Sequence, residues 1–209
     1  MSLLKELTVP LMDEDVTSLE VGESVLLNGI ICTARDAVHK WLMETFVVKK
    51  KELSMEDEIV FQEIRNYLSN GVIYHCGPIV SQDGHGGYRV LAAGPTTSIR
   101  EEEYEADVIK LFNVKAVIGK GGMGERTLNA CKEGPAVYLH AVGGAAVLLG
   151  KTVEKVLGVM KLEFGIPEAI WVMKVADFPA IVTMDAHGNS LHSMIEENSK
   201  RMLEQFLGT

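Results

Sequence analysis

Four short segments of the chain carry residue types that could bind and transform a small anion. The first is Thr33-Ala34-Arg35-Asp36-Ala37-Val38-His39, where an apolar run gives way to a helical pattern. Free N–H groups and the positive end of a helix dipole favour anions at such a junction. Arg35 adds a planar fork suited to a carboxylate, and Asp36 and His39 share one helix face. The structural alternative is that Thr33 or Asp36 caps the helix, Arg35 pairs at the surface and His39 packs as a polar residue.

The second segment, Gly94-Pro95-Thr96-Thr97-Ser98-Ile99-Arg100, presents three hydroxyls after a rigid turn and just before a helical pattern. Hydroxyl and amide donors in such a loop could bind an oxyanion, with Arg100 neutralising its charge. The alternative is a helix cap, because Ser98 and Glu101 have the spacing of a capping box. A cap uses only one hydroxyl, so the two interpretations are compatible.

The third segment, Gly119-Lys120-Gly121-Gly122-Met123-Gly124, matches G-x-G-x-x-G between a predicted strand and a predicted helix. A dinucleotide site would need an acidic residue roughly 20 residues further on, and residues 137–145 contain no Asp or Glu. A Walker A loop is excluded as well, because Gly121 replaces the Ser or Thr that should follow the lysine. The segment therefore favours Lys120 on a thin glycine loop that reaches a small anion, with a simple tight turn as the alternative.

The fourth segment, Tyr138 to Ala146, combines His140 with small residues that allow close packing of a helix on a sheet. Its backbone amides would make a minor contribution to a site. The three cysteines, Cys32, Cys76 and Cys131, are far apart and lack C-x-x-C spacing. This pattern indicates neither a disulfide framework nor a metal site on this chain, and a reducing cytoplasm fits it best.

The bulk composition limits the classes of partner. The 209 residues include 29 acidic and 20 basic side chains, which gives a formal net charge of −9. Binding to nucleic acid or to an anionic membrane surface is therefore a poor expectation. Met1 to Lys5 shows no signal-peptide core, and no apolar run approaches the roughly 20 residues that span a bilayer. We expect a soluble, cytoplasmic protein.

The hydrophobic periodicity predicts a mixed α/β domain over residues 1–209, with its glycine loops at one edge of a sheet. The helix expected at 54–69 has an apolar stripe of Ile59, Val60, Ile64 and Leu68, and the turn at 83–87 predicts a hairpin. Strands are expected at 24–33, 72–80 (interrupted at Gly77-Pro78), 88–93, 116–118, 136–140, 169–175 and 180–184. Helices are expected at 34–50 (ending in Lys49-Lys50-Lys51), 54–69, 100–112, 125–132 and 191–207, with a small one after Gly143-Gly144.

Taken in order, these segments resemble one family, the beta subunits of class I fumarate hydratase and tartrate dehydratase, equivalent to the carboxy-terminal domain of single-chain class I fumarases. The resemblance covers about Val21 to Leu191. The residues that carry it are Thr33-Ala34-Arg35-Asp36 with His39, His75-Cys76-Gly77-Pro78, Gly94-Pro95-Thr96-Thr97-Ser98 with Arg100, Gly119-Lys120-Gly121-Gly122-Met123, and Phe178-Pro179-Ala180 with Asp185, Gly188 and Asn189.

The resemblance implies a swivelling β/β/α domain, a mixed sheet with flanking helices. It also implies a partner alpha subunit that holds a [4Fe–4S] cluster, whereas this chain holds no metal. By motif position, Arg35, Arg100 and Lys120 would bind the substrate carboxylates, together with Thr97 and Gly121. Thr96 would abstract the proton. The family pattern commonly has methionine at the position of Glu101, so this residue is expected to add negative charge near the anion site.

The implied reaction is the reversible hydration of fumarate to (S)-malate, in which a proton leaves the carbon beside a carboxylate. A threonine hydroxyl is a weak base, so His39 or Asp36 is a further candidate to receive the proton. The alternatives are an L-tartrate dehydratase beta subunit, which would convert tartrate to oxaloacetate, and a dicarboxylate-binding module without catalysis. Apolar surface meant for the alpha subunit would also allow the isolated chain to form homodimers.

Overall fold

The strands form a mixed sheet that closes on itself. The computed structural model describes residues 4–48, 54–84 and 86–207. The sheet order is β1-β2-β3-β6-β7-β9-β8, and an additional pairing joins β2 to β9. That pairing closes β2, β3, β6, β7 and β9 into a five-stranded barrel. These strands are β1 (Lys5–Thr8), β2 (Ser24–Thr33), β3 (Val72–Tyr74), β6 (Ala116–Gly119), β7 (Val137–His140), β8 (Val153–Met160) and β9 (Ile170–Met184).

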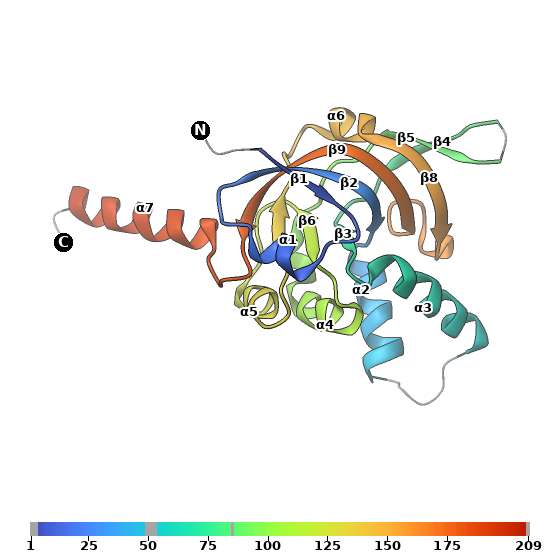
Figure 1. Cartoon of the computed structure of the whole chain (residues 1–209), viewed down its shortest axis with the longest axis horizontal. Coiled ribbons are helices and arrows are strands. Elements are labelled where there is room, and N and C mark those ends of the chain that lie inside the picture. Colours follow the sequence, from blue (N-terminus) through green and yellow to red (C-terminus); the bar gives the residue numbers. More distant parts are fainter. Residues whose placement is uncertain (1–3, 49–53, 85, 208–209) are drawn as a thin grey trace.

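Strand direction divides the barrel into two parts. The pairs β2–β3, β3–β6 and β6–β7 are parallel, whereas β9 runs antiparallel to β2, β7 and β8. The three parallel pairs need crossover connections, and helices supply them on one side of the sheet (Figure 1). These helices are α2 (Asp36–Leu42), α3 (Met55–Leu68), α4 (Glu102–Phe112) and α5 (Glu125–Glu133).

The remaining elements lie around this centre. A π-helical segment, Met43–Val48, continues α2, and a short 3₁₀ helix, Ser98–Glu101, precedes α4. A separate hairpin, β4 (Ile79–Gln82) with β5 (Tyr88–Ala92), extends from the barrel beside α6 (Ala146–Lys151) (Figure 1). Two further short helices lie in loops between strands. α1 (Asp13–Thr17) connects β1 to β2, and the 3₁₀ turn Leu162–Phe164 connects β8 to β9.

Alternation along the barrel strands separates two hydrophobic cores. Along β3, Val72 and Tyr74 belong to one buried cluster and Ile73 to the other. Val117 in β6 and Tyr138 in β7 join the cluster that contains Ile73 and the helix residue Phe112. Because side chains alternate across a strand, one cluster fills the barrel and the other lies beneath the helices. Both faces are buried, which explains why these strands read as continuous apolar runs.

The α/β fold class, the mixed sheet and the flanking helices are confirmed, and several expected bounds are corrected. The runs 169–175 and 180–184 are a single strand, β9, that bends at Asp177, whose φ is +52° and whose N–H donates to the Asn28 side chain. Ile59 lies on the exposed side of α3, so the inward stripe follows Val60, Ile64 and Leu68 instead. Lys49-Lys50-Lys51 lies outside the described residues.

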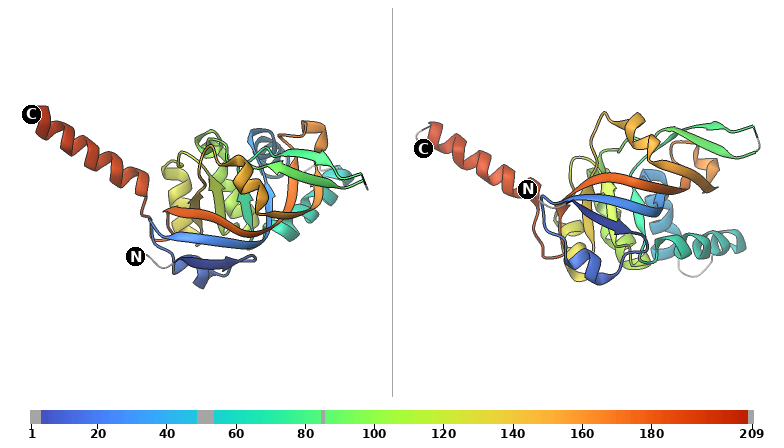
Figure 2. Two further views of the ribbon diagram at one scale, coloured as in Figure 1. Left: turned by 90° about the horizontal axis from the view of Figure 1, so that it is seen from above. Right: turned by 45° about the horizontal axis from the view of Figure 1, so that its top comes forward.

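The last helix, α7 (Leu191–Leu207), leaves the body of the molecule and contacts it only near its start (Figure 2). Its bounds agree with those expected from the sequence. In the part of the chain that the structure describes, no helix has the length and apolar character to cross a membrane. The single-domain assignment of 1–209 and the swivelling designation stay predictions.

Candidate active site

Three of the segments that carry the family resemblance begin where β2, β3 and β6 end. These strands are parallel neighbours, so their carboxyl ends share one edge of the barrel. Backbone hydrogen bonds hold the loop after β5 between the segments that follow β3 and β6. Thr96 N–H donates to the His75 carbonyl at 2.7 Å, and Lys120 N–H donates to the Thr96 carbonyl at 3.2 Å. Ser98 N–H donates in turn to the Lys120 carbonyl at 3.1 Å. The tertiary fold thereby brings together the second and third segments.

A fully buried network links the segments from beneath. Glu105, on α4, places Oε2 3.0 Å from His39 Nε2 and 2.8 Å from His75 Nε2. His75 Nδ1 lies 2.8 Å from the Ser98 hydroxyl, which also accepts from the Tyr138 hydroxyl at 2.8 Å. One carboxylate therefore joins the segment of Arg35 and Asp36, through His39, to the segment of Thr96 and Arg100.

The hydrogen-bond partners of His39 and His75 determine the protonation state of each ring. His39 faces an acceptor on each side, because Nδ1 lies 3.0 Å from the Arg35 carbonyl and Nε2 faces the Glu105 carboxylate. Both ring nitrogens must therefore donate, which makes His39 an imidazolium. His75 donates from Nε2 and accepts from Ser98 at Nδ1, so it is neutral.

The directions of the pKa shifts agree with this assignment. Burial opposes ionisation of Glu105, yet the charges and hydrogen bonds of His39 and His75 outweigh it and lower its pKa to about 2. Burial also opposes charge on His39, but the Glu105 carboxylate prevails and raises the His39 pKa. For His75 burial prevails and lowers the pKa. The network thus contains one buried ion pair, Glu105 with His39, and a neutral second histidine.

The helix caps expected as alternatives in the first two segments do not form. The other parts of the alternative for the first segment agree with the structure, because Arg35 pairs with Glu168 and His39 is a buried polar residue. Ser98 does not cap a helix, since its hydroxyl is engaged by His75 and Tyr138 and no side chain caps the 3₁₀ turn. Thr33 donates to the Ala169 carbonyl and accepts from Trp171 N–H instead of capping α2. The two hydroxyls that resemble caps in the sequence therefore make long-range contacts.

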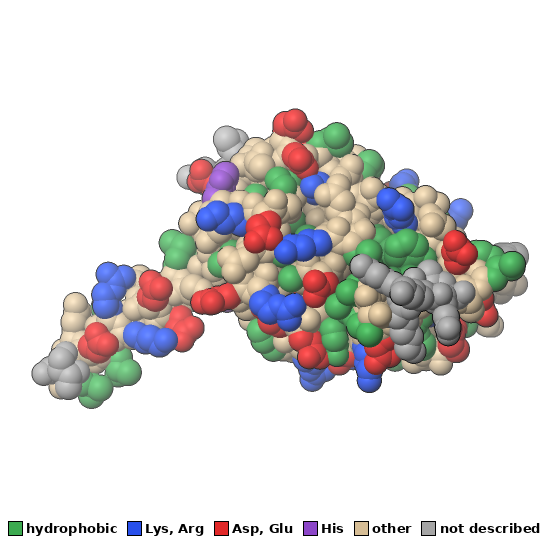
Figure 3. Space-filling view, turned by 90° about the horizontal axis from the view of Figure 1, so that it is seen from below, with side chains coloured by type: hydrophobic (Ala, Val, Ile, Leu, Met, Phe, Trp, Pro, Cys, Tyr) green, Lys and Arg blue, Asp and Glu red, His purple; other side chains and the backbone are tan. Residues whose placement is uncertain are grey.

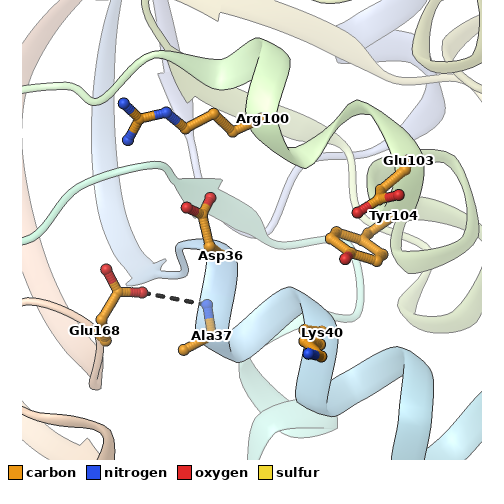
Figure 4. Close-up of a pocket in the computed structure, with 7 residues that line it drawn as sticks. All are labelled: Asp36, Ala37, Lys40, Arg100, Glu103, Tyr104 and Glu168. Atoms are coloured by element: carbon orange, nitrogen blue, oxygen red, sulfur yellow. Dashed lines mark hydrogen bonds between the residues drawn. The ribbon is translucent and has the colours of Figure 1, made fainter.

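A pocket of about 440 Å³ lies beside the network, within the range typical of small-ligand sites. Arg100 and Asp36 line opposite sides of it, with Glu168 at its margin (Figure 4). The complete lining is Asp36, Ala37, Lys40, Arg100, Glu103, Tyr104 and Glu168. An exposed arginine that faces a carboxylate across a small pocket suits a ligand that carries both a carboxylate and an acidic C–H or hydroxyl group.

Arg35 is held next to this pocket by a carboxylate of the chain itself. Its Nη2 lies 3.1 Å from Glu168 Oε1, and Glu168 Oε2 accepts from Ala37 N–H at 3.2 Å in the first turn of α2 (Figure 4). Glu168 thus occupies the position that the sequence pattern indicated for an anion. Gly77 makes room for the guanidinium, because a Cβ at this position would lie 2.7 Å from Arg35 Nη1.

Lys120 and Gly121 lie on the neighbouring loop. Lys120 forms an isolated parallel β-bridge with Thr97. Gly121 has a φ of +80°, which residues other than glycine rarely adopt. Thr96 donates its hydroxyl to the His75 carbonyl at 3.0 Å. Neither Arg35, Thr96 nor Lys120 lines the pocket that contains Arg100. The convergence of all three cations on one substrate therefore stays a prediction.

Among the catalytic candidates, Asp36 is exposed in the pocket and His39 is fully buried with both ring nitrogens bonded. This burial favours a positioning role for His39 over proton abstraction. Two acidic residues were missed by sequence reasoning, namely Glu105 and Glu168. A carboxylate inside the apolar face of α4 was the available signal for Glu105, because unpaired charges are rarely buried. No local signal marks Glu168.

Glu101 does not add the negative charge that the sequence led us to expect near the anion site. Its side chain is 1% exposed. Burial, followed by a hydrogen bond with Asp36, raises its pKa to about 8. At neutral pH this carboxyl group is mostly protonated and donates to the Asp36 carboxylate. Glu101 therefore adds little negative charge beside the pocket.

The free energy of unfolding is expected to fall as the pH rises from about 5 to 8, because folded Glu101 keeps a proton that the unfolded chain releases. This contribution is complete below the ordinary pKa of 4.5 and is lost as the pH passes through about 8. The slope is at most about 1.4 kcal/mol per pH unit. Urea unfolding of Glu101→Gln at several pH values should show a flatter profile, whereas exposed Glu103→Gln should keep the wild-type slope. Parallel profiles for wild type and Glu101→Gln would contradict the neutral carboxyl.

Two sets of side chains contain atoms of the kinds that bind metals, namely the His39, His75 and Glu105 cluster and the three cysteines. His39, His75 and Glu105 offer ligand atoms within 4.8 Å of one another. Their direct hydrogen bonds of 2.8 to 3.0 Å leave no space between them for an ion. The three cysteines are buried, and this burial raises each thiol pKa to about 12. Neither set of residues fits an iron–sulfur cluster, which needs thiolates.

The fold is an α/β domain in which the loops of Thr96 and Lys120 lie side by side at one edge of the barrel. The chain belongs to the Fumarase C-terminus family, whose model matches residues 4–195. A protein of Geobacillus stearothermophilus, provisionally named class I fumarate hydratase, is 49% identical over 200 residues, which are 96% of this chain and 36% of that protein. The L(+)-tartrate dehydratase subunit beta of Escherichia coli K12 is 37% identical over 202 residues, which are 96% of this chain and 91% of that subunit. The expected family is confirmed.

Proposed function

We propose that this chain is the beta component of an iron–sulfur hydro-lyase that hydrates fumarate to (S)-malate and catalyses the reverse dehydration. The observation that carries the proposal is the pocket in which Arg100 faces Asp36, next to the tied loops of Thr96 and Lys120. The relative provisionally named class I fumarate hydratase supports the choice of fumarate. The tartrate dehydratase relative, of which the chain covers nearly the whole length, makes L-tartrate the second candidate.

The cations would bind the two carboxylates of the substrate. Arg100 is exposed in the pocket and free to form a bidentate pair. Arg35 is already paired with Glu168, so a substrate carboxylate would have to take the place of Glu168 on Arg35 and on the α2 amide. Lys120, on its glycine loop, would approach the other end of the substrate. Such groups stabilise the negative charge that develops on a carboxylate as the adjacent C–H bond breaks.

Proton transfer would involve Thr96 and Asp36. The Thr96 hydroxyl donates to the His75 carbonyl, and this bond orients its oxygen. Asp36 lines the pocket, and its hydrogen bond with Glu101 orients its carboxylate. A hydroxyl that abstracts a proton needs such a carboxylate to receive the proton next.

The family resemblance and the name of the tartrate dehydratase relative as a beta subunit favour an alpha partner. A [4Fe–4S] cluster on that partner would supply a Lewis acid for the substrate hydroxyl. Exposed apolar side chains around the candidate site, including Ile99, Val142 and Leu148, provide surface for this partner. We therefore expect the isolated chain to be inactive.

Anaerobic coexpression with an alpha subunit tests the proposal. The complex should hydrate fumarate, as followed by the loss of fumarate absorbance, and the same preparation should be assayed with L-tartrate. A preference for tartrate would select the second candidate. A complex that binds dicarboxylates and turns over neither substrate would support the remaining alternative, a binding module without catalysis.

Arg100→Ala should lower kcat/KM of the complex by roughly 10- to 100-fold, because it removes a charge-assisted bond to a substrate carboxylate. Lys120→Ala should act in the same direction. The matched control is Arg126→Ala, since Arg126 is exposed on α5 and pairs with Asp107 at the surface. Wild-type kinetics for both Arg100→Ala and Lys120→Ala would exclude the carboxylate-binding roles.

A further inference from the structure

Glu168 separates Arg35 from the candidate pocket. The Glu168 side chain lines the pocket together with Arg100, whereas Arg35 does not line it. Glu168 Oε1 lies 3.1 Å from Arg35 Nη2, so the carboxylate stands between the second arginine and the pocket. Figure 4 shows Arg100 and Glu168 approaching the same space from different elements, with the Glu168 carboxylate turned toward the start of α2. Of the two arginines, the pocket therefore exposes only Arg100.

Arg35 is held in place by a neutral partner as well as by Glu168. Its Nη1 donates to the Pro167 carbonyl at 3.2 Å. Gly77 leaves room for this contact, because a Cβ there would lie 2.6 Å from the Pro167 oxygen and 2.7 Å from Arg35 Nη1. If the Glu168 side chain moves away, the carbonyl still orients the guanidinium and Nη2 is free to donate. The guanidinium is thus preorganised for a carboxylate from a ligand.

The backbone around Glu168 is anchored, so only its side chain has to move. Glu168 N–H donates to the Gly165 carbonyl at 3.0 Å, and the Trp171 indole N–H donates to the Ile166 carbonyl at 2.8 Å. The side chains of Arg35 and Glu168 are 20% and 24% exposed, so water reaches the pair. Rotamer changes of such partly exposed side chains are fast. Rotation of the Glu168 side chain would therefore release Arg35 without opening the fold.

The surface charge makes individual cations important for binding an anion. The chain has a formal net charge of −9. Figure 3, which views the molecule from below the orientation of Figure 1, shows acidic and basic side chains interspersed over that face. Such a surface provides little long-range attraction for an anion. The affinity for an anionic ligand then depends on single charge-assisted contacts, and an arginine withheld by the chain's own carboxylate lowers it.

A ligand with two carboxylates is best suited to displace Glu168. A ligand with one carboxylate can pair with Arg100 and leave the ion pair of Glu168 and Arg35 intact. When a ligand carries a second carboxylate, the contact with Arg100 holds that group close to Arg35 at a high effective concentration. The second carboxylate can then replace the Glu168 carboxylate on Nη2, and the charge of Arg35 stays neutralised throughout the exchange.

We propose that Glu168 is an internal competitor for Arg35, which a dicarboxylate displaces so that Arg35 and Arg100 each bind one of its carboxylates. The inference rests on the function proposed above and adds the residue that controls access to the second arginine. Glu168 thereby favours dicarboxylates over monocarboxylates, because only a second carboxylate compensates for the loss of the ion pair.

Binding of succinate tests the competition, since this saturated C4 dicarboxylate cannot be consumed by the proposed reaction. In calorimetric titrations of the full chain, Glu168→Gln should bind succinate roughly 5- to 20-fold more tightly than wild type, because glutamine keeps the size of the side chain and loses its charge. Glu168→Ala, whose side chain cannot reach Arg35, should bind at least as tightly as Glu168→Gln.

The matched control is Glu103→Gln, which removes the same charge from the lining of the same pocket. Its succinate affinity should stay within about twofold of wild type, because a change of one solvent-screened charge has a small effect. Equal gains for Glu103→Gln and Glu168→Gln would overturn the proposal. So would an unchanged or weaker affinity in Glu168→Gln, or no succinate binding by either wild type or Glu168→Gln.

A structure of the chain with succinate tests the exchange directly. One succinate carboxylate should lie within hydrogen-bond distance of Arg35 Nη2 and the other should pair with Arg100, with the Glu168 carboxylate rotated away. Succinate on Arg100 with Glu168 still on Arg35 would overturn the proposal. Neither test requires turnover, so a complex without hydro-lyase activity would contradict the proposed function alone. Failure of both succinate tests in a chain whose complex hydrates fumarate would reject the role of Glu168 alone.

Discussion

Thr96→Ala is expected to lower kcat of the assembled enzyme by about 10² to 10⁴-fold, the usual contribution of a positioned acid–base group. The variant loses the hydroxyl that donates to the His75 carbonyl, but the backbone bond of Thr96 N–H to the same carbonyl remains. The loop should therefore keep its place, and substrate affinity should change little. The measurement is steady-state kinetics under anaerobic conditions, with substrate affinity determined separately by equilibrium binding.

The conservative variant Thr96→Ser separates the chemistry of the hydroxyl from the packing of the methyl group. Serine keeps the oxygen and should retain most of the turnover. If Thr96→Ala turns over substrate at the wild-type rate, Thr96 has no part in proton transfer, and Asp36 becomes the candidate base. If both variants lose substrate binding to the same extent, Thr96 binds the substrate rather than its proton.

Glu105→Ala is expected to lower the free energy of unfolding by about 3 to 5 kcal/mol, the usual cost of leaving one partner of a buried ion pair alone. The change removes the acceptor of both His39 and His75 and leaves the His39 imidazolium without a counter-charge. Chemical denaturation of the purified chain measures this loss. Since small domains are stable by roughly 5 to 15 kcal/mol, the variant would be at the edge of folding.

Glu105→Gln keeps the shape of the side chain and one carbonyl acceptor, so it should fold when the alanine variant does not. Its amide cannot accept strongly from two imidazoles, and the pKa of His39 should fall toward the ordinary range, which NMR titration of the ring protons detects. The control Glu103→Gln, two residues away on the exposed side of α4, should leave stability and titration unchanged. An unchanged stability in both Glu105 variants would exclude the ion pair.

The loss of Glu105 should also reach the candidate site. His39 anchors the carbonyl of Arg35, and His75 anchors Thr96 through its own carbonyl. A carboxylate that touches neither pocket nor substrate thereby positions a cation and a hydroxyl that belong to different segments. We expect Glu105→Gln to lower kcat more than it raises KM, because small displacements of reacting groups affect the transition state most.

Local patterns in the sequence predicted much of the fold. The apolar run over Ser24–Thr33 and the amphipathic pattern over Leu191–Leu207 have the bounds that the structure gives to β2 and α7. The hairpin of β4 and β5 followed from its turn residues. Where the prediction was wrong, long-range contacts prevailed. The sequence predicted two strands at 169–175 and 180–184, yet pairing with β2 joins them into the single strand β9.

The residue types of the candidate site were equally visible in the sequence, and its arrangement was not. Arginine, lysine and threonine beside glycine loops indicated an anion site because charge and donor geometry belong to the side chains themselves. Their surroundings come from distant segments: Glu105 lies 66 residues from His39, and Glu168 lies 131 residues from Ala37. The tertiary structure alone decided that His39 is charged and buried, that Glu101 is mostly neutral, and that Arg35 is already paired. These properties depend on burial and neighbouring charge, which only the closed barrel determines.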